Sequence, residues 1–142
     1  MPNAPVPIDD DEVLYRRIPV SCDWYEAEGG VLYPEAFAPR RDEHSGISVY
    51  RKRFKTLEEV ARGRSKQGYY VVSLLASELR VRGLNVEPRP EVEDGWDDAH
   101  AEIPSLHAGI RKTNEADELQ AILAELGMVI PVEGPFIPHV DQ

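Results

Sequence analysis

Cysteine is nearly absent from the chain, which excludes disulfide cross-linking as a source of stability. Cys22 is the only cysteine among the 142 residues, so no disulfide can form within the chain. A zinc site would therefore need histidines or carboxylates as ligands. The four histidines (His44, His100, His107 and His139) include no pair spaced four residues apart. We therefore expect no metal site, and we expect Cys22 to be a small, partly buried side chain.

Long apolar runs are missing as well. A helix needs about 20 apolar residues to cross a bilayer, and no run in the chain approaches that length. Residues 1–7 contain three prolines, without a basic stretch or an apolar core, which is not the pattern of a secretory signal. We therefore expect a cytoplasmic protein with no membrane partner.

Several common catalytic and nucleotide-binding motifs are absent. No serine lies in a Gly-x-Ser-x-Gly context, which argues against an α/β-hydrolase. Gly29, Gly30 and Gly63 match neither a phosphate-binding loop nor a dinucleotide fingerprint. His100-Ala101-Glu102 has the His-x-Glu spelling of zinc deaminases, but the cysteines that such a site requires do not follow. The sequence therefore predicts no cofactor and no complete catalytic set.

Basic residues are fewer than acidic ones, 16 against 26, and the net charge is −10. Such a balance argues against general binding to nucleic acids or anionic membranes. The charge is uneven, because residues 40–66 hold nine basic and four acidic residues. This segment is net +5 and the rest of the chain is net −15. It can present a basic surface to an acidic partner, although a solvated surface is the simpler interpretation.

What is present is sufficient for one folded domain. Hydrophobic residues make up 42% of the chain, and its length is close to the commonest domain size. We expect an α+β fold, with a small mixed or antiparallel sheet and two short helices packed on it. Its expected parts are a mobile N-terminal arm over residues 1–12, a single domain over 13–131 and an extended tail over 132–142.

Alternating or continuous apolar residues predict the strands, which are expected at 13–19, 46–51, 69–75, 84–87 and 128–131. Residues 69–75 are apolar on both faces, as is typical of an interior strand. In the first strand, alternation places Tyr15 and Arg17 on the face opposite Leu14 and Arg16. His100 and Glu102 are two residues apart, so they would share a face of a strand.

Capping signals predict the helices. Thr56 and Glu59 have the spacing of a capping box, which predicts a helix through Arg62 that ends at Gly63. Ser77 is expected to cap a helical turn over residues 76–82.

The third capping signal is Asn114, which is expected to open an amphipathic helix over 115–126. Two other segments are expected to be loops. One covers residues 20–46, with a helical turn at 34–37, and the other is an acidic loop over 91–98.

Five polar residues are the candidates for chemistry: Arg16, Arg17, Tyr50, His100 and Glu102. His100 and Glu102 can act as a base and the carboxylate that orients it, although a structural histidine bonded to backbone is an equal alternative. The order of an arginine, a tyrosine and a glutamate on successive strands is similar to that of small ADP-ribosyltransferases, which bind NAD in a cleft.

The chain also resembles a family of small bacterial proteins with no established activity. The shared segments are Arg16-Arg17-Ile18-Pro19, Pro34-Glu35-Ala36-Phe37, Gly46-Ile47-Ser48-Val49, Leu84-Asn85-Val86 and Ala99-His100-Ala101-Glu102-Ile103. Together they cover roughly residues 13–105. The resemblance implies a bacterial, soluble, single-domain protein, and it makes His100 the first residue to test.

Three functions remain open. The first is a small accessory or interaction protein that recognises a protein partner through its uneven charge. The second is a small ADP-ribosyltransferase-like or other nucleotide-handling enzyme that uses the five candidate residues. The third is a nucleic-acid binder through residues 40–66, where Tyr50 and Phe54 could stack on bases. Convergence of the candidate side chains in one concave pocket would favour the enzyme.

Overall fold

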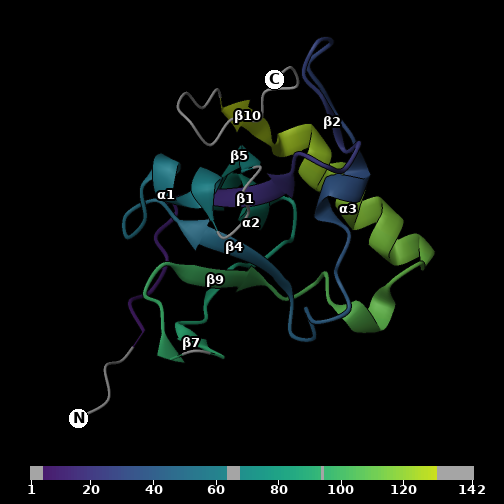
Figure 1. The fold of residues 1–142 in the computed structure, drawn as a ribbon. Helices are drawn as coiled ribbons and strands as arrows, with labels where there is room; N and C mark the ends of the chain where they lie inside the picture. Colours follow the sequence, from purple (N-terminus) through teal and green to yellow (C-terminus); the bar gives the residue numbers. More distant parts are fainter. Residues whose placement is uncertain (1–4, 64–67, 94, 131–142) are drawn as a thin grey trace.

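The protein is built around one six-stranded sheet (Figure 1). The structure, a computed structural model, describes residues 5–63, 68–93 and 95–130. Every pair of neighbouring strands in the sheet is antiparallel. In spatial order the strands are β10 (Met128–Ile130), β5 (Tyr69–Leu75), β1 (Val13–Pro19), β4 (Ile47–Arg51), β9 (His100–Ile103) and β6 (Glu87–Pro88). The expected α+β class with an antiparallel sheet is therefore confirmed.

Four of the expected strands are confirmed as β1, β4, β5 and β10. The apolar strand β5 lies between β1 and β10, as expected for an interior strand. The expected strand over 84–87 is wrong in extent, because only Glu87 and Pro88 pair with β9. Leu84 and Val86 are instead buried in the core as irregular chain that leads from a helix to the sheet edge.

Within the described residues three α-helices accompany the sheet: α1 (Leu57–Arg62), α2 (Ala76–Val81) and α3 (Asn114–Leu126). The capping box of Thr56 and Glu59 is confirmed, with both of its hydrogen bonds present. The helix ends at Gly63, where φ is +49° and a Cβ would lie 2.4 Å from the ring of Tyr69. No helix within the described ranges is long and apolar enough to cross a bilayer.

The other two capping predictions are wrong. Helix α2 follows β5 without a loop, and its N-cap is Leu75 rather than Ser77. Helix α3 is capped by the hydroxyl of Thr113, which accepts a hydrogen bond from the amide of Ala116, so Asn114 is its first residue. Because α2 is a helix and not a single turn, the sheet carries three α-helices and not two.

Two short hairpins replace parts of the two segments that we expected to be loops. The pair β2 (Tyr25–Glu26) and β3 (Val31–Leu32) forms one hairpin. The pair β7 (Glu91–Val92) and β8 (Gly95–Trp96) forms the other. The helical turn expected at 34–37 is confirmed as the 3₁₀ turn η1, Pro34–Phe37. A second 3₁₀ turn, η2, covers Ala108–Ile110.

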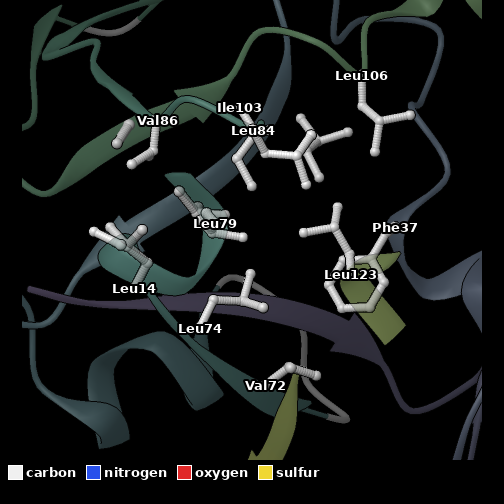
Figure 2. Close-up of a cluster of buried hydrophobic side chains, with 14 of the residues drawn as sticks. Leu14, Phe37, Val72, Leu74, Leu79, Leu84, Val86, Ile103, Leu106 and Leu123 are labelled. Carbon is white, nitrogen blue, oxygen red and sulfur yellow. The ribbon is translucent and has the colours of Figure 1, made fainter. Parts of the chain in front are cut away.

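One face of the sheet packs against α2, α3 and η1 and contains the main hydrophobic core (Figure 2). Leu79 from α2, Leu123 from α3 and Phe37 from η1 meet the sheet residues Leu14 and Leu74 there. All five side chains are almost completely shielded from solvent. Burying a side chain of this size contributes about 1.5–3 kcal/mol, so this layer supplies most of the stability of the fold.

The opposite face of the sheet has a smaller apolar cluster under α1. Val60 and Ala61 of the helix pack on Tyr15 of β1 and Val71 of β5. Helix α1 therefore covers the β1–β5 part of this face. None of the described helices covers the same face over β4 and β9, so side chains that point outward there border open space beside α1.

The N-terminal segment is held against the domain from residue 5 onward. The guanidinium of Arg51, which is 1% exposed, bonds to the carboxylate of Glu12 at 2.6 and 2.9 Å. It also donates to the backbone carbonyls of Val6 and Pro7. Residues 5–12 of the expected arm are attached to the domain, because the buried guanidinium needs acceptors. Residues 1–4 of the arm and the expected tail over 132–142 lie outside the described residues.

Glu12→Gln should destabilise the protein by about 2–4 kcal/mol, since it leaves the buried Arg51 without a charged partner. The matched control is Asp10→Asn in the same segment, which removes an exposed ion pair with Arg80. That change should cost less than about 1 kcal/mol. Urea denaturation measures both, and an equal effect of the two variants would show that the Arg51 pair does not hold the arm.

Candidate functional site

Antiparallel register gathers polar side chains on the open face of β4 and β9. Tyr50 lies opposite His100, and Ser48 lies opposite Glu102. Because side chains alternate along a strand, all four point to the same side of the sheet. Arg17 of β1 is on this side too, since Tyr15, two residues before it, pairs with Tyr50. The sheet therefore brings residues from three strands to one surface.

A cleft of about 890 Å³ opens beside α1 on this surface. Arg17, Tyr50 and His100 all line it, so three of the five candidate residues converge in one concave site, as the enzyme hypothesis required. Most of its other lining residues come from α1, from the segments that flank that helix and from the β7–β8 hairpin with the residue after it, among them Lys55, Glu58, Gly63, Trp96 and Asp97. A cleft of this size can accept an organic ligand.

A smaller cleft of about 190 Å³ adjoins the first one. The two clefts share Arg17, Asp42 and Tyr50, so Tyr50 lies at the boundary between them. Ser48 and Arg16 line only the smaller cleft. The smaller cleft thus adds Arg16 and Ser48 to the polar side chains around Tyr50.

Two hydrogen bonds hold the His100 ring, one to the backbone of Arg89 and one to the side chain of Ser48. Its Nδ1 lies 2.7 Å from the backbone carbonyl oxygen of Arg89, and its Nε2 lies 3.0 Å from Ser48 Oγ. A carbonyl oxygen can only accept, so Nδ1 must carry the proton and donate. In the neutral ring Nε2 is then the acceptor, and the Ser48 hydroxyl donates to it. Ser48 Oγ, the His100 ring and the Arg89 carbonyl therefore form one continuous chain of hydrogen bonds.

Two cations, Arg17 and Lys55, lie close to the ring of Tyr50. Arg17 Nη1 donates to the Tyr50 hydroxyl at 3.1 Å, and the Arg17 guanidinium lies 4.3 Å from the ring centroid. The ammonium group of Lys55 lies 4.8 Å from the same centroid. Arg17 Nε donates to the carbonyl of Val60, which ties the arginine to α1. These contacts fix the positions of the Tyr50 and Arg17 side chains at the boundary of the two clefts.

Arg16 lies on the core face of the sheet, at the point where β1 and β4 separate. Pairing of these strands ends at Tyr15 and Tyr50. Beyond it, the amide of Ser48 donates to the Glu43 carboxylate at 2.7 Å, and the Ser48 carbonyl accepts from Arg16 Nη1 at 2.9 Å. Arg16 and Glu43 also form an ion pair at 3.0 Å, with both side chains buried. Their side chains thus bind the backbone of Ser48 in place of a neighbouring strand.

The charge of Glu43 is stabilised by this arrangement. Burial on its own would raise the pKa of Glu43, because it disfavours the charged form. The nearby charge and hydrogen bond of Arg16, and the amides of Ser48 and Arg40, outweigh burial and lower the pKa of Glu43 below its ordinary value of 4.5. The carboxylate is therefore ionised at neutral pH and holds Arg16 in place.

Glu102 is near the site but does not contribute to either cleft as the described residues form them. It lies across from Ser48, yet its carboxylate accepts from Ser45 Oγ at 2.8 Å and lies 3.5 Å from Arg89 Nε. The predicted partnership with His100 is therefore not seen. The imidazole takes the carbonyl of Arg89 as its acceptor instead, because that carbonyl lies directly at Nδ1.

Lys55 and Asp97 form an ion pair at the edge of the larger cleft, at 3.0 Å. Burial would raise the pKa of Asp97, but hydrogen bonds from Lys55 and the Ala99 amide, with the charge of Lys55, lower it overall. The basic segment 40–66 is divided among several places, since Arg51 is buried and Lys55 is paired. The part of the chain that the structure describes contains no group of three or more His, Cys, Asp or Glu placed to bind a metal ion.

Ser48 is the residue that sequence reasoning missed. Its position two residues before Tyr50 on a predicted strand places it on the same face, which is a signal that the sequence contains. The pairing with His100 is not such a signal, because it joins positions 52 residues apart through the register of β4 and β9.

No family model matches the chain, and no curated protein and no solved structure matches it either. The resemblance to a bacterial family stays a prediction.

The low pKa of Glu43 predicts a loss of stability at acid pH. A carboxyl whose pKa is lower in the folded state stabilises the fold above its unfolded-state pKa, near 4.5, and this contribution is lost as the pH falls through the folded-state value. Glu43→Gln should lower the unfolding free energy by about 3 kcal/mol at pH 7 and make it depend less on pH below 5.

Urea denaturation between pH 7 and pH 3 provides the test, with the exposed substitution Glu118→Gln as control for the loss of one negative charge. An acid dependence identical in Glu43→Gln and in the original protein would show that Glu43 is not held by Arg16.

Proposed function

We propose that the chain is a small enzyme of acyl transfer, in which Ser48 is the nucleophile and His100 is its general base. The single observation that carries this proposal is the chain of hydrogen bonds from Ser48 Oγ to His100 Nε2 and from His100 Nδ1 to the Arg89 carbonyl. It meets the geometric test for an activated nucleophile, which is a base within hydrogen-bond reach and a third group that orients the base.

The absence of a Gly-x-Ser-x-Gly motif does not oppose this proposal. That motif describes a turn between a strand and a helix in one particular fold. Serine–histidine pairs recur on unrelated folds and are recognised by geometry rather than by sequence position. Here the serine lies within strand β4 and the histidine on the neighbouring strand β9. Pairing of two strands gives the required distance without a specialised turn.

The reaction follows from the positions of the protons. Ser48 Oγ attacks the carbonyl carbon of an ester or thioester, and its proton passes to His100 Nε2. The tetrahedral intermediate then expels the alcohol or thiol, which takes this proton from Nε2. The acyl group remains on Ser48. A water molecule that loses a proton to His100 attacks the acyl carbon, releases the carboxylic acid and returns the proton to Ser48.

The surroundings suit this chemistry. Cationic groups that face the clefts, such as Arg17, favour the negative charge that develops on the substrate oxygen. The Tyr50 hydroxyl accepts from Arg17, so its own proton is available to donate toward the cleft. The larger cleft offers the aromatic side chain of Trp96 for the body of a substrate.

The other functions rank lower. Convergence of Arg17, Tyr50 and His100 in one cleft supports an enzyme over an accessory protein, and the protein-partner hypothesis stays a prediction. The comparison with ADP-ribosyltransferases has less support, because the carboxylate of Glu102 bonds to Ser45 and approaches Arg89. Nucleic-acid binding through residues 40–66 also has less support, because Arg51 is buried.

A fluorophosphonate probe tests the nucleophile without knowledge of the substrate. The probe reacts with activated serines by forming an Oγ–phosphorus bond and releasing fluoride. We expect one labelled residue, Ser48, by mass spectrometry, and no labelling of Ser48→Ala. The matched control is Ser73→Ala on strand β5, whose hydroxyl faces the same side of the sheet and bonds to the Met128 carbonyl. Labelling unchanged in Ser48→Ala, or absent from the original protein, would refute the proposal.

His100→Ala separates catalysis from structure. If His100 is the base, the labelling rate of Ser48 should fall by about 100-fold or more. The half-buried ring also makes two hydrogen bonds, so we expect the unfolding free energy to fall by about 1–3 kcal/mol. Labelling kinetics and urea denaturation are measured on the same preparation. A stability loss with an unchanged labelling rate would assign His100 a purely structural role.

A further inference from the structure

We propose that the smaller cleft is a binding site for an oxyanion, the carboxylate or phosphate group of a ligand, held by Arg16 Nη2 with the help of Arg17 and Arg40. This inference extends the proposed function by naming the chemical class of the substrate. The site itself can be tested by binding alone, so it stands or fails independently of Ser48 as a nucleophile.

The first observation is an unsatisfied buried nitrogen. The side chain of Arg16 is 3% exposed, and its Nε and Nη1 donate to the Ala36 carbonyl, the Glu43 carboxylate and the Ser48 carbonyl. Its Nη2 is shielded from solvent and has no hydrogen-bond partner among the described residues. A buried charged donor without an acceptor costs free energy. Arg16 lines the smaller cleft, so an acceptor bound there can satisfy this nitrogen once the guanidinium moves toward it.

A second buried arginine shows that the fold can satisfy such a group. Arg51 is also on the core face of the sheet, and Nε, Nη1 and Nη2 all bond to Glu12 or to the carbonyls of Val6 and Pro7. The missing partner of Arg16 is therefore specific to its position. It occurs at the arginine that borders a cleft, and not at the one sealed by the N-terminal segment.

Charge and size fit a small oxyanion. Three arginines (Arg16, Arg17 and Arg40) and two acids (Asp42 and Glu43) line the smaller cleft, which leaves a charge of +1. The larger cleft has the opposite balance, with Arg17, Lys55 and Arg62 against Asp42, Glu58, Glu59, Glu93 and Asp97, which leaves −2. A volume of about 190 Å³ holds one carboxylate or phosphate group with a few neighbouring atoms. An anion is therefore directed to the smaller cleft.

The acids in the smaller cleft do not prevent this binding. Glu43 is bonded to Arg16 and to the amides of Ser48 and Arg40, which use its two oxygens. Asp42 is exposed to solvent, where its charge is screened.

The position of the site defines the substrate. Ser48 lines the same cleft, so a bound oxyanion lies beside the proposed nucleophile. The substrate is then an ester or thioester whose acyl part carries a carboxylate or phosphate close to the carbonyl carbon. Tyr50 lines both clefts and marks the boundary between them. The remaining part of the substrate extends past Tyr50 into the larger cleft.

Titration with sodium phosphate and, separately, sodium acetate at constant ionic strength tests the site. Calorimetry measures the affinity, and ¹H–¹⁵N NMR follows the Ser48 amide and the Arg16 Nε–H. We expect saturable shifts of both signals. Binding of phosphate but not acetate identifies a phosphate group, and the reverse identifies a carboxylate. Saturation without a shift of either signal would overturn the proposal, as would affinity no greater than that for chloride.

Variants locate the binding. Arg16→Lys keeps the charge but loses the second nitrogen, so affinity should fall by about tenfold or more. Arg40→Gln removes an exposed charge and should cost about threefold. The control is Arg82→Gln on the other side of the sheet, which changes the net charge equally and should have no effect. Equal weakening by all three variants would mean nonspecific attraction. If Arg16→Lys does not fold, the NMR shifts of the original protein and the affinity of Arg40→Gln test the site in its place.

Ser48→Ala distinguishes this proposal from the proposed function. Anion affinity that survives in Ser48→Ala while fluorophosphonate labelling is lost supports both. Labelling of Ser48 without anion binding refutes the oxyanion site and leaves the nucleophile in place. Anion binding without labelling refutes the nucleophile, and the smaller cleft is then a binding site only.

Discussion

The ion pair between Arg16 and Glu43 is the interaction on which the site depends. Strands β1 and β4 separate beyond Tyr15 and Tyr50, and the backbone of Ser48 would otherwise lose its partners on that side. The buried pair supplies both a donor and an acceptor to this backbone. It therefore allows the sheet to open without leaving unsatisfied peptide groups. The opening produces the smaller cleft, with Ser48 at its border and the guanidinium beside it.

One face of the sheet carries the main hydrophobic core, and the other carries the polar side chains of the candidate site. Odd and even positions of β4 show this, because Ile47, Val49 and Arg51 are buried whereas Ser48 and Tyr50 are half-buried on the other side. Ile47 and Val49 belong to the main core, and Arg51 bonds to the N-terminal segment. A sheet with one covered and one partly open face thus gives a rigid base for polar side chains from three strands.

Local patterns were enough to predict the elements but not the site. The strands β1, β4 and β5 and the capping box of Thr56 follow from residues close in sequence. The hairpins were missed because strands of two residues have no periodicity to detect. Arg17, Tyr50 and His100 were grouped as candidates from the sequence, and all three line the larger cleft. Ser48 was missed, because its pairing with His100 depends on the register of β4 and β9. Arg16 lies on the core face of the sheet, as alternation along the strand predicts, and it lines the smaller cleft.

The two buried arginines use the same chemistry for different ends. Both carry a full charge into the core, and each requires a carboxylate from a distant segment to make this possible. Every guanidinium nitrogen of Arg51 is bonded, and these bonds join the N-terminal segment to the sheet. Among the described residues Arg16 has one nitrogen without a hydrogen-bond partner, and its side chain lines the cleft that Ser48 also lines. A buried charged donor without an acceptor costs free energy, and this cost is the physical argument that a ligand completes the site.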